Sequence, residues 1–444
     1  DPVASLPPSI VLNDFQSKRI FQRRGRASDV FISGSFRGRP TAIEAQVLHY
    51  RTNAVVVPWT VVDSTPTNGI FMGIVTGVPQ GGWYRMAVRF QNRPEIFQRG
   101  SSQWAVGILV ACIGQSNMKE WFFSGGNGRT KDLLSIHRNG QWISAEDVGR
   151  GAATFGNRII DRLSIPVGLL DYAVNGSGLR READWGTGYW ADRSEKSIYQ
   201  EFVRGVTAAG GAVEYVVWMQ GEADAARKTI TEGQYGHTLK AFINQQVRKD
   251  IVNGYDGSRL PFLIVGMPKR PIGQDEPHQA IRNALVAATQ NIPECHLAAT
   301  TLDLENLGRQ HLSPEAYGEL GLRLSQTVLY LLGKSNYYRG PSLDRIRRVS
   351  PIIVDIDLHH RGGSDFAPLF DITGFEIRHQ DTPLAITQVQ RHNPRTIRIH
   401  LATPAPPGPL TVRYLYGAMP DSSAAVRDNS KLRLPLEPFV ARVE

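Results

Sequence analysis

The first hundred residues alternate short apolar runs with turn-forming clusters, a pattern typical of antiparallel β structure. Clusters such as Pro66-Thr67-Asn68-Gly69 separate runs rich in Val, Ile and aromatic residues. In residues 83–90 every second side chain is large and apolar, at Tyr84, Met86, Val88 and Phe90. This alternation indicates a strand with one buried face. We therefore predict a small N-terminal β-sandwich over residues 1–102.

From about residue 103 the pattern changes to continuous apolar runs that alternate with helical periods. We predict buried strands at 106–113, 166–174, 213–219, 262–267 and 296–302. Ser313 as N-cap, Pro314 at the first helical position and Gly333 beyond the end frame a last helix. Alternation of strands and helices favours a parallel sheet with helices on both faces. We assign residues 103–335 to this α/β domain.

After Gly333 the period of two returns. Ile397, Ile399 and Leu401 share one face of an expected strand. A second strand and its apolar face follow a proline-rich turn, at Leu410, Val412, Tyr414 and Tyr416. These signals predict a second β-sandwich over residues 341–444.

Composition narrows the class of protein without naming its function. The 444 residues are 41% hydrophobic and 20% charged, as in ordinary soluble globular proteins. The longest apolar stretch, 104–113, has ten residues, about half of the 20 that a membrane-spanning helix needs. The net charge of +9 comes from 50 basic and 41 acidic residues. Because the basic residues are scattered, we expect no nucleic-acid partner.

Two cysteines, at 112 and 295, are too few for a disulfide framework, and no zinc-binding spacing occurs. We expect Cys112 to be a buried thiol, and we expect neither a metal nor another cofactor. The chain begins Asp1-Pro2-Val3 without an initiator Met. This start fits the mature form of an exported protein, so we expect a periplasmic or secreted location.

Ligands of parallel sheets bind at the carboxyl ends of the strands, and Gly114-Gln115-Ser116-Asn117-Met118 follows the first predicted strand. Gly114 permits a tight turn, and Ser116 then stands at the start of the next helix, where a developing negative charge is stabilised. Met118 occupies the place where the nucleophile elbow of α/β-hydrolases needs glycine. The alternative is that Ser116 only caps the helix.

Three further segments follow later strands. In Asn175-Gly176-Ser177-Gly178 the glycine lets a backbone N–H approach a ligand. In Gln220-Gly221-Glu222 the Gln220 amide can donate to an oxyanion. His311, two residues before the N-cap Ser313, can reach the same crevice and act as the base that a serine nucleophile needs. Singly, each of these segments can also be an ordinary turn.

Together these four blocks resemble the SGNH (GDSL-type) hydrolases, and within them the carbohydrate esterases typified by sialate O-acetylesterases. The resemblance covers about residues 103–333. It implies a flavodoxin-like, three-layer α/β domain flanked by accessory β-sandwiches. It also implies that Ser116 is the nucleophile and His311 the general base. The oxyanion hole would consist of the Ser116 and Gly176 N–H groups and the Gln220 side chain.

One position departs from the family pattern. Members often carry an aspartate three residues before the histidine, and here Gly308 stands there. A backbone carbonyl can hold the histidine tautomer in a Ser-His dyad, Asp303 or Glu305 can supply the acid instead, or the site can be inactive. We favour the dyad, because the other blocks are intact and a carbonyl can accept from the imidazole ring.

Aromatic and basic residues near the blocks are candidates for sugar binding. Exposed rings stack on sugar faces, although the same rings can belong to the core, and the candidates are Trp121, Phe122, Phe123, Trp185, Tyr189 and Trp190. Arg180 and Arg181 can bind a carboxylate or lie on the surface.

The sequence thus predicts a serine esterase that removes O-acetyl groups from a sugar or polysaccharide. The same machinery can run as an O-acetyltransferase. A non-catalytic glycan-binding protein with a degenerate central domain is the alternative from another class.

Overall fold

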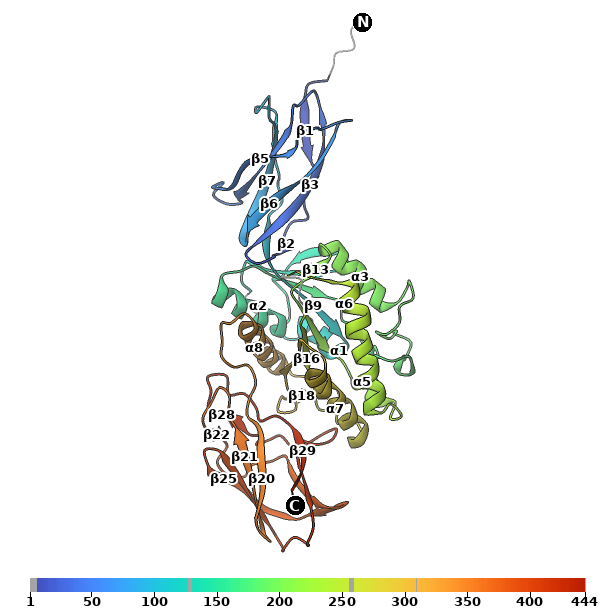
Figure 1. The fold of residues 1–444 in the computed structure, drawn as a ribbon, viewed down its shortest axis with the longest axis vertical. Helices are drawn as coiled ribbons and strands as arrows, with labels where there is room; N and C mark the ends of the chain where they lie inside the picture. The colour runs from blue at the N-terminus through green and yellow to red at the C-terminus, as the bar shows by residue number, and fades with distance from the viewer. Residues whose placement is uncertain (1–5, 127–129, 255–258, 309, 444) are drawn as a thin grey trace.

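The computed structural model describes residues 6–126, 130–254, 259–308 and 310–443. They form three parts in a row, with the N-terminal strands at one end and the C-terminal strands at the other (Figure 1). The central part carries almost all the helices and lies between the two β domains. This mixed α/β architecture confirms the predicted class of fold.

The N-terminal domain consists of two groups of strands around one apolar core. One sheet has the order β1-β3-β6, with β1 Ser9–Leu12, β3 Ala27–Arg37 and β6 Ile70–Pro79. The other group is β2 Arg19–Gln22, β4 Ile43–His49, β5 Val55–Asp63, β7 Gly81–Phe90 and β8 Phe97–Arg99. In β7 the four residues predicted to share one face are all buried.

The second group is not separate from the central sheet, because β2 and β7 both pair with the first residues of β9, Trp104–Gly114. The two domains therefore share a continuous strand. A single apolar run, read in the sequence as one strand of the α/β domain, serves the N-terminal core with its beginning and the central core with its end.

The central parallel strands lie in the order β10-β12-β9-β14-β16-β17, with β11 added antiparallel at the edge. Taken without β10, they follow the order 2-1-3-4-5 of doubly wound sheets, in which ligands bind beside the first strand. The strands are β10 Leu134–Arg138, β11 Gln141–Ser144, β12 Val167–Asp171, β14 Tyr215–Met219, β16 Phe262–Val265 and β17 Cys295–Ala299.

Helices cover both faces of this sheet. One apolar core includes side chains of α1 Ser116–Phe123, α2 Arg150–Leu163 and α8 Pro314–Leu331. The core on the opposite face includes side chains of α3 Ile198–Ala209, α4 Glu222–Ala226, α5 Glu232–Ala241 and α7 Asp275–Asn291. Short elements complete the domain: η1 Arg181–Ala183, β13 Ala212–Val213, η2 Phe242–Val247, α6 Arg248–Asp250, β15 Val252–Asn253, β18 Asn306–Leu307 and β19 His311–Leu312.

The last helix begins as predicted. The Ser313 hydroxyl accepts from Ala316 N at 3.2 Å, and Pro314 occupies the first turn. Three strands end earlier than predicted, since β12 stops at Asp171, β16 at Val265 and β17 at Ala299. Asp171, the last residue of β12, is buried and forms ion pairs with Lys119 and Arg138. The strand therefore ends at a charged residue, although apolar residues follow it in the sequence.

The C-terminal domain is a sandwich of two four-stranded antiparallel sheets. Their orders are β20-β21-β26-β25 and β24-β23-β27-β29, and a pair β22-β28 lies beside them. The bounds are β20 Ser342–Ser350, β21 Ile353–His359, β22 Phe366–Ala367, β23 Phe375–His379, β24 Thr382–Leu384, β25 Ile386–Asn393, β26 Thr396–Leu401, β27 Leu410–Tyr414, β28 Arg427–Asp428 and β29 Phe439–Val443.

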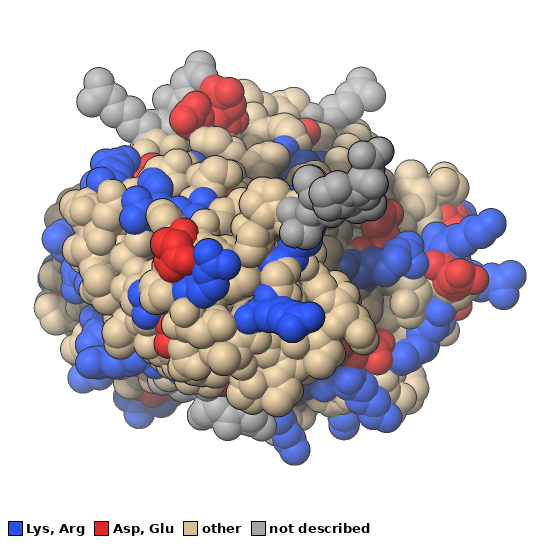
Figure 2. Space-filling view, turned by 90° about the horizontal axis from the view of Figure 1, so that it is seen from above, with Lys and Arg blue, Asp and Glu red and all other residues tan. Residues whose placement is uncertain are grey.

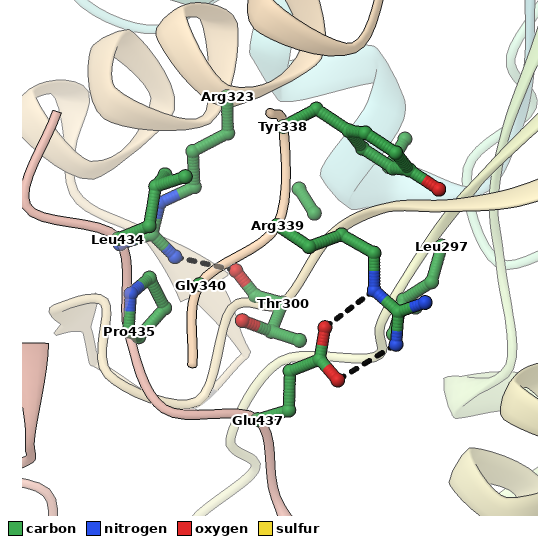
Figure 3. Close-up of a pocket in the computed structure, with 11 residues that line it drawn as sticks. Leu297, Thr300, Arg323, Tyr338, Arg339, Gly340, Leu434, Pro435 and Glu437 are labelled. Atoms are coloured by element: carbon green, nitrogen blue, oxygen red, sulfur yellow. Dashed lines mark hydrogen bonds and ion pairs between the residues drawn. The ribbon is translucent and has the colours of Figure 1, made fainter. Parts of the chain in front are cut away.

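Charged side chains help to attach this sandwich to the central domain. Figure 3 shows Arg339 of the connector with its guanidinium against the Glu437 carboxylate, at 2.5 and 2.7 Å. Nearby, Arg323 of α8 donates to Thr300 O at 2.6 Å. Arg427 of β28 forms an ion pair with Asp303 at 2.7 Å. These charge-assisted hydrogen bonds fix the geometry of the interface.

The surface agrees with the scattered charge of the sequence. Seen from the N-terminal end, Lys and Arg side chains are spread between uncharged and acidic ones (Figure 2). Within the described part of the chain, no helix is both long and apolar enough to cross a membrane. Cys112 is fully buried, as predicted.

Candidate active site

Ser116 stands where the central strand β9 turns into α1. Gly114 has φ of +136°, and a Cβ there would lie 2.0 Å from Met219 O of the neighbouring strand, so only glycine fits. Gln115 N donates to the same carbonyl at 3.0 Å. The N-cap is Gln115 and Ser116 is the first helical residue, so Ser116 is not the cap considered in the sequence reading. Its partly exposed side chain lies at the carboxyl edge of the sheet.

Asn117 joins this turn to the segment that carries His311. Its Nδ2 donates to Gln310 O at 3.1 Å, and its Oδ1 accepts from Leu312 N at 3.4 Å. The Tyr317 hydroxyl donates to the same Oδ1 at 2.7 Å. The residue after Ser116 therefore contacts the backbone on both sides of His311. The Asn117 side chain thus links the Ser116 turn to the backbone around His311, which lies 195 positions after Ser116 in the sequence.

Glu222 also lies beside Asn117, and the sequence alone gave it no catalytic role. Its Oε1 accepts from Asn117 Nδ2 at 2.7 Å, whereas the buried Oε2 has no hydrogen-bond partner among the described residues. Burial raises the pKa of this carboxyl, and the Asn117 hydrogen bond, the backbone N–H of Glu222 and the charges of Arg270 and His311 offset part of that rise. Glu222 thus places a buried carboxyl in electrostatic reach of His311.

The acids proposed from the sequence have other partners or lie at the surface. Gly308 has φ of +67° in the turn between β18 and β19, and no atom lies within 4 Å of a Cβ built on it. Asp303 is held by two nitrogens of Arg323, at 2.8 and 2.6 Å, and by Arg427. Glu305 is exposed. Asp303 is therefore committed to the domain interface.

Gly176 lies beside the end of β9, as the sequence reading expects. Val174 N donates to Gly114 O at 3.0 Å, and Ser177 Oγ donates to the same carbonyl at 3.2 Å. Gly176 itself has φ of +71° and is partly exposed, so its turn depends on glycine. These bonds hold the Gly176 turn against the Ser116 turn.

Gln220 has internal partners for its whole amide. Nε2 donates to Asp224 Oδ2 at 2.7 Å and also approaches Gln115 Oε1 and Ser177 O, both at 3.2 Å. The Tyr235 hydroxyl donates to Oε1 at 2.7 Å. Only 1% of the residue is exposed. The geometry therefore favours a side chain that ties two turns together over one that donates to substrate.

The aromatic candidates separate into core and surface. Trp121, Phe122 and Trp190 are at most 1% exposed and pack in the two cores. Trp185 is 53% exposed. Its Nε1 donates to Ala223 O, next to Glu222, at 3.3 Å, and the Arg227 guanidinium covers one ring face at 3.7 Å. Burial thus shows which of these rings belong to the core and which are exposed enough to contact a sugar, a distinction that the residue types alone do not make.

The remaining candidates near this loop differ in how firmly they are held. Phe123 is 49% exposed, and Tyr189 is partly buried. Arg180 is held by Glu182, Thr238 and Gln234 O, whereas Arg181 is exposed.

Comparison with known proteins finds one matching family. Residues 130–330 match the family model described as carbohydrate esterase, sialic acid-specific acetylesterase. The match begins after Ser116 and includes Gly176, Gln220 and His311. No curated relative matches the chain.

Among solved structures, XAC1771, described as a novel carbohydrate acetylesterase from Xanthomonas citri, superposes with a TM-score of 0.69 at 19% identity, covering 98% of this chain and 99% of that one. Est24, a carbohydrate acetylesterase from Sinorhizobium meliloti, overlaps at a TM-score of 0.33 and 13% identity, over 50% of this chain and 99% of that one.

The XAC1771 match shows a fold shared along the whole chain, both β domains included. The family match confirms the resemblance read from the sequence blocks, although it covers just under half of the residues. Over residues 130–330 the central domain of this chain is thus similar to the carbohydrate esterases of the sialic acid-specific acetylesterase family.

Proposed function

We propose that this protein removes O-acetyl groups from a carbohydrate with Ser116 as nucleophile and His311 as general base. The observation that carries the proposal is Asn117, which bonds to both neighbours of His311 and directly follows Ser116. A serine is a useful nucleophile only beside such a base. Acetate release from an O-acetylated sugar, lost when either residue is replaced, tests the proposal.

The chemistry balances with these groups alone. Ser116 Oγ attacks the acetyl carbonyl carbon while His311 takes its proton. When the bond between the carbonyl carbon and the sugar oxygen breaks, His311 returns the proton to that oxygen, leaving acetyl-Ser116. A water molecule then gives a proton to His311 and attacks the acetyl carbonyl carbon. The bond between that carbon and Ser116 Oγ breaks, His311 returns the proton to Oγ, and acetic acid leaves as acetate and a proton. If an alcohol replaces that water, the product is a transferred acetyl group, so measuring both products separates the esterase from the transferase.

The N–H groups of Ser116 and Gly176 are the proposed donors to the oxyanion. Both follow strands that end at the same edge, and α1 adds the favourable end of its dipole. In this proposal Gln220 supports the hole from behind, since it bonds to the residues adjoining both donors, Gln115 and Ser177.

Replacing Gln220 by Ala is therefore expected to lower stability as well as activity. The change removes the amide partner of Asp224 Oδ2 and of the Tyr235 hydroxyl. Asp224 keeps the Leu179 and Arg180 N–H groups and Tyr235 keeps the backbone carbonyl of residue 220 at 3.4 Å, so we expect a cost of about 1–3 kcal/mol in the free energy of unfolding. Denaturant unfolding beside turnover measures both effects. Gln290→Ala, at an exposed position of α7, is the control. An unchanged unfolding free energy with lost turnover would instead support direct donation.

For the substrate, we propose that a pyranose ring stacks on the open face of Trp185. The other face is covered by Arg227 and the indole N–H is bonded to Ala223 O, so the ring is fixed before a sugar arrives. Asp184 Oδ1 accepts from Gly186 N and Gly188 N and stiffens the loop. A preorganised, half-exposed indole offers a flat apolar surface at low entropic cost.

Trp185→Ala is then expected to lower kcat/KM for an O-acetylated oligosaccharide by about tenfold, the equivalent of about 1.4 kcal/mol. An aryl acetate has no sugar to stack, so its turnover is expected to stay at the wild-type level. Phe97→Ala, at a 56% exposed aromatic residue of β8, is the matched control. Equal losses on both substrates would contradict the stacking role.

A further inference from the structure

The loop after β16, residues 267–270, is held by the C-terminal domain. Arg270 N donates to Ala418 O at 2.8 Å, and Lys269 Nζ donates to Ser422 Oγ at 2.7 Å. We call residues 267–270 the bridging segment. It belongs to the central domain by sequence, yet both of its last residues are bonded to one turn of the C-terminal sandwich.

An arginine of α7 also links the bridging segment to the C-terminal sandwich. The buried Arg282 side chain donates through Nε to Met267 O at 3.1 Å and through Nη2 to Pro268 O at 3.0 Å. Its Nη1 donates to Gly417 O of the C-terminal domain. One guanidinium thus holds the bridging segment and the sandwich together. The position of the segment is set by both domains.

The bridging segment also contacts both halves of the proposed catalytic apparatus. Arg270 Nη1 donates to Glu222 O at 2.9 Å. Asn306 Nδ2 donates to Lys269 O at 2.7 Å, and Asn306 pairs with Leu312 in the hairpin that carries His311. One residue, Arg270, therefore separates the C-terminal sandwich from the backbone of Glu222. Two residues, Lys269 and Asn306, separate it from the backbone of Leu312, which directly follows His311.

We propose that the C-terminal sandwich positions the catalytic Glu222 and His311 through the bridging segment, with Arg270 as the main positioning residue. The inference rests on the proposed esterase function. It gives the sandwich a role in turnover of any acetyl ester, separate from glycan binding. Because Glu222 begins α4 and His311 lies in β19, the bridging segment adds a second shared support to the one that Asn117 provides.

Besides its hydrogen bonds, Arg270 acts on the Glu222 carboxyl through its positive charge. Charged or titratable groups reach Glu222 from every side: Arg270, Arg282 of α7, His311 of β19, Tyr235 of α5 and Tyr317 of α8. Of these, Arg270 and His311 lower the pKa of the Glu222 carboxyl against the rise that burial causes. Removing the Arg270 charge raises the pKa of Glu222. The Glu222 carboxylate is then protonated at a higher pH.

Arg270→Met in the full chain, assayed on an aryl acetate, is the test. We expect kcat to fall about tenfold with KM nearly unchanged, and the acid limb of the kcat/KM profile to move to higher pH. Arg270→Lys is expected to restore the acid limb, because the charge returns. Glu437→Gln breaks the Arg339 ion pair elsewhere in the same interface and is expected to keep wild-type kcat and the wild-type profile.

A second pair of variants keeps the inference testable if Arg270→Met does not fold. Lys269→Met and Ser422→Ala each remove the bond between the segment and the sandwich, and each is expected to lower kcat a few-fold, with no further loss in the double variant. Wild-type kcat in both, or an equal loss in Glu437→Gln, overturns the inference while the esterase proposal stands. A wild-type protein without Ser116-dependent turnover overturns both.

Discussion

Ser116→Ala is expected to reduce turnover of acetyl esters by at least about 10⁴-fold, because the covalent route is lost when the nucleophile is removed. The small remaining rate would come from the oxyanion donors and from substrate binding. Acetate release from an aryl acetate and from an O-acetylated sugar measures the loss. Stability is expected to be unchanged, since the Ser116 hydroxyl has no hydrogen bond to another described residue that the variant would break.

Ser124→Ala, just beyond the other end of α1, is the matched control and is expected to keep wild-type turnover. Turnover that persists in Ser116→Ala at the wild-type rate would assign the activity to another residue. Loss in both variants would point to a general disturbance of α1 instead.

Glu222→Gln is the second variant with a large expected effect. We propose that Glu222 replaces the acid missing at Gly308 and stabilises the protonated form of His311. Replacing it by the neutral amide is expected to lower kcat by up to about 10⁴-fold, the loss seen when the acid of a serine triad is neutralised. The fold is expected to survive, because Gln can still accept from Asn117 through Oε1.

The direction in which Glu222→Gln changes the stability of the protein can also be predicted. Burial raises the pKa of Glu222, so the folded state holds its proton to a higher pH than the unfolded state does. This group's contribution to stability is therefore present at low pH and is lost as the pH rises past the folded-state pKa. At neutral pH the uncharged Gln removes the penalty, and the melting temperature is expected to stay the same or to rise.

Glu305→Gln separates this assignment from the one considered in the sequence. Glu305 is exposed and its backbone carbonyl, not its side chain, accepts from Ser313 N at 3.0 Å. Wild-type kcat is expected in this variant. A loss of activity in Glu305→Gln, with normal activity in Glu222→Gln, would reverse the two assignments.

Local signals explain which parts of the fold were predictable. Ser313, Pro314 and the apolar period between them and Gly333 specify α8 through contacts within a few residues. The alternation in β7 likewise reports a buried face directly. The pairing of β9 with β2 and β7 joins residues that are at least 20 positions apart, and no pattern along the chain encodes it.

The site divides in the same way. Gly114 and Ser116 follow from a strand, a turn and a helix start that lie next to each other in the sequence. Asn117 and Glu222 stand in the sequence segments that contain Ser116 and Gln220. Their role depends on hydrogen bonds to Gln310, Leu312 and each other, which the sequence does not reveal. Trp121 and Trp185 have the same chemistry in the sequence, and only the packing of α1 buries the first.

The most direct test of the central claim is peptide mass spectrometry of the protein quenched during turnover of an acetyl ester. Glu222→Gln is the suitable background, since slow deacylation lets the covalent species accumulate. We expect an acetyl group on the peptide that contains Ser116, and none in the Ser116→Ala variant. Acetate release with no acetylated peptide, or with the acetyl group on another residue, would contradict it.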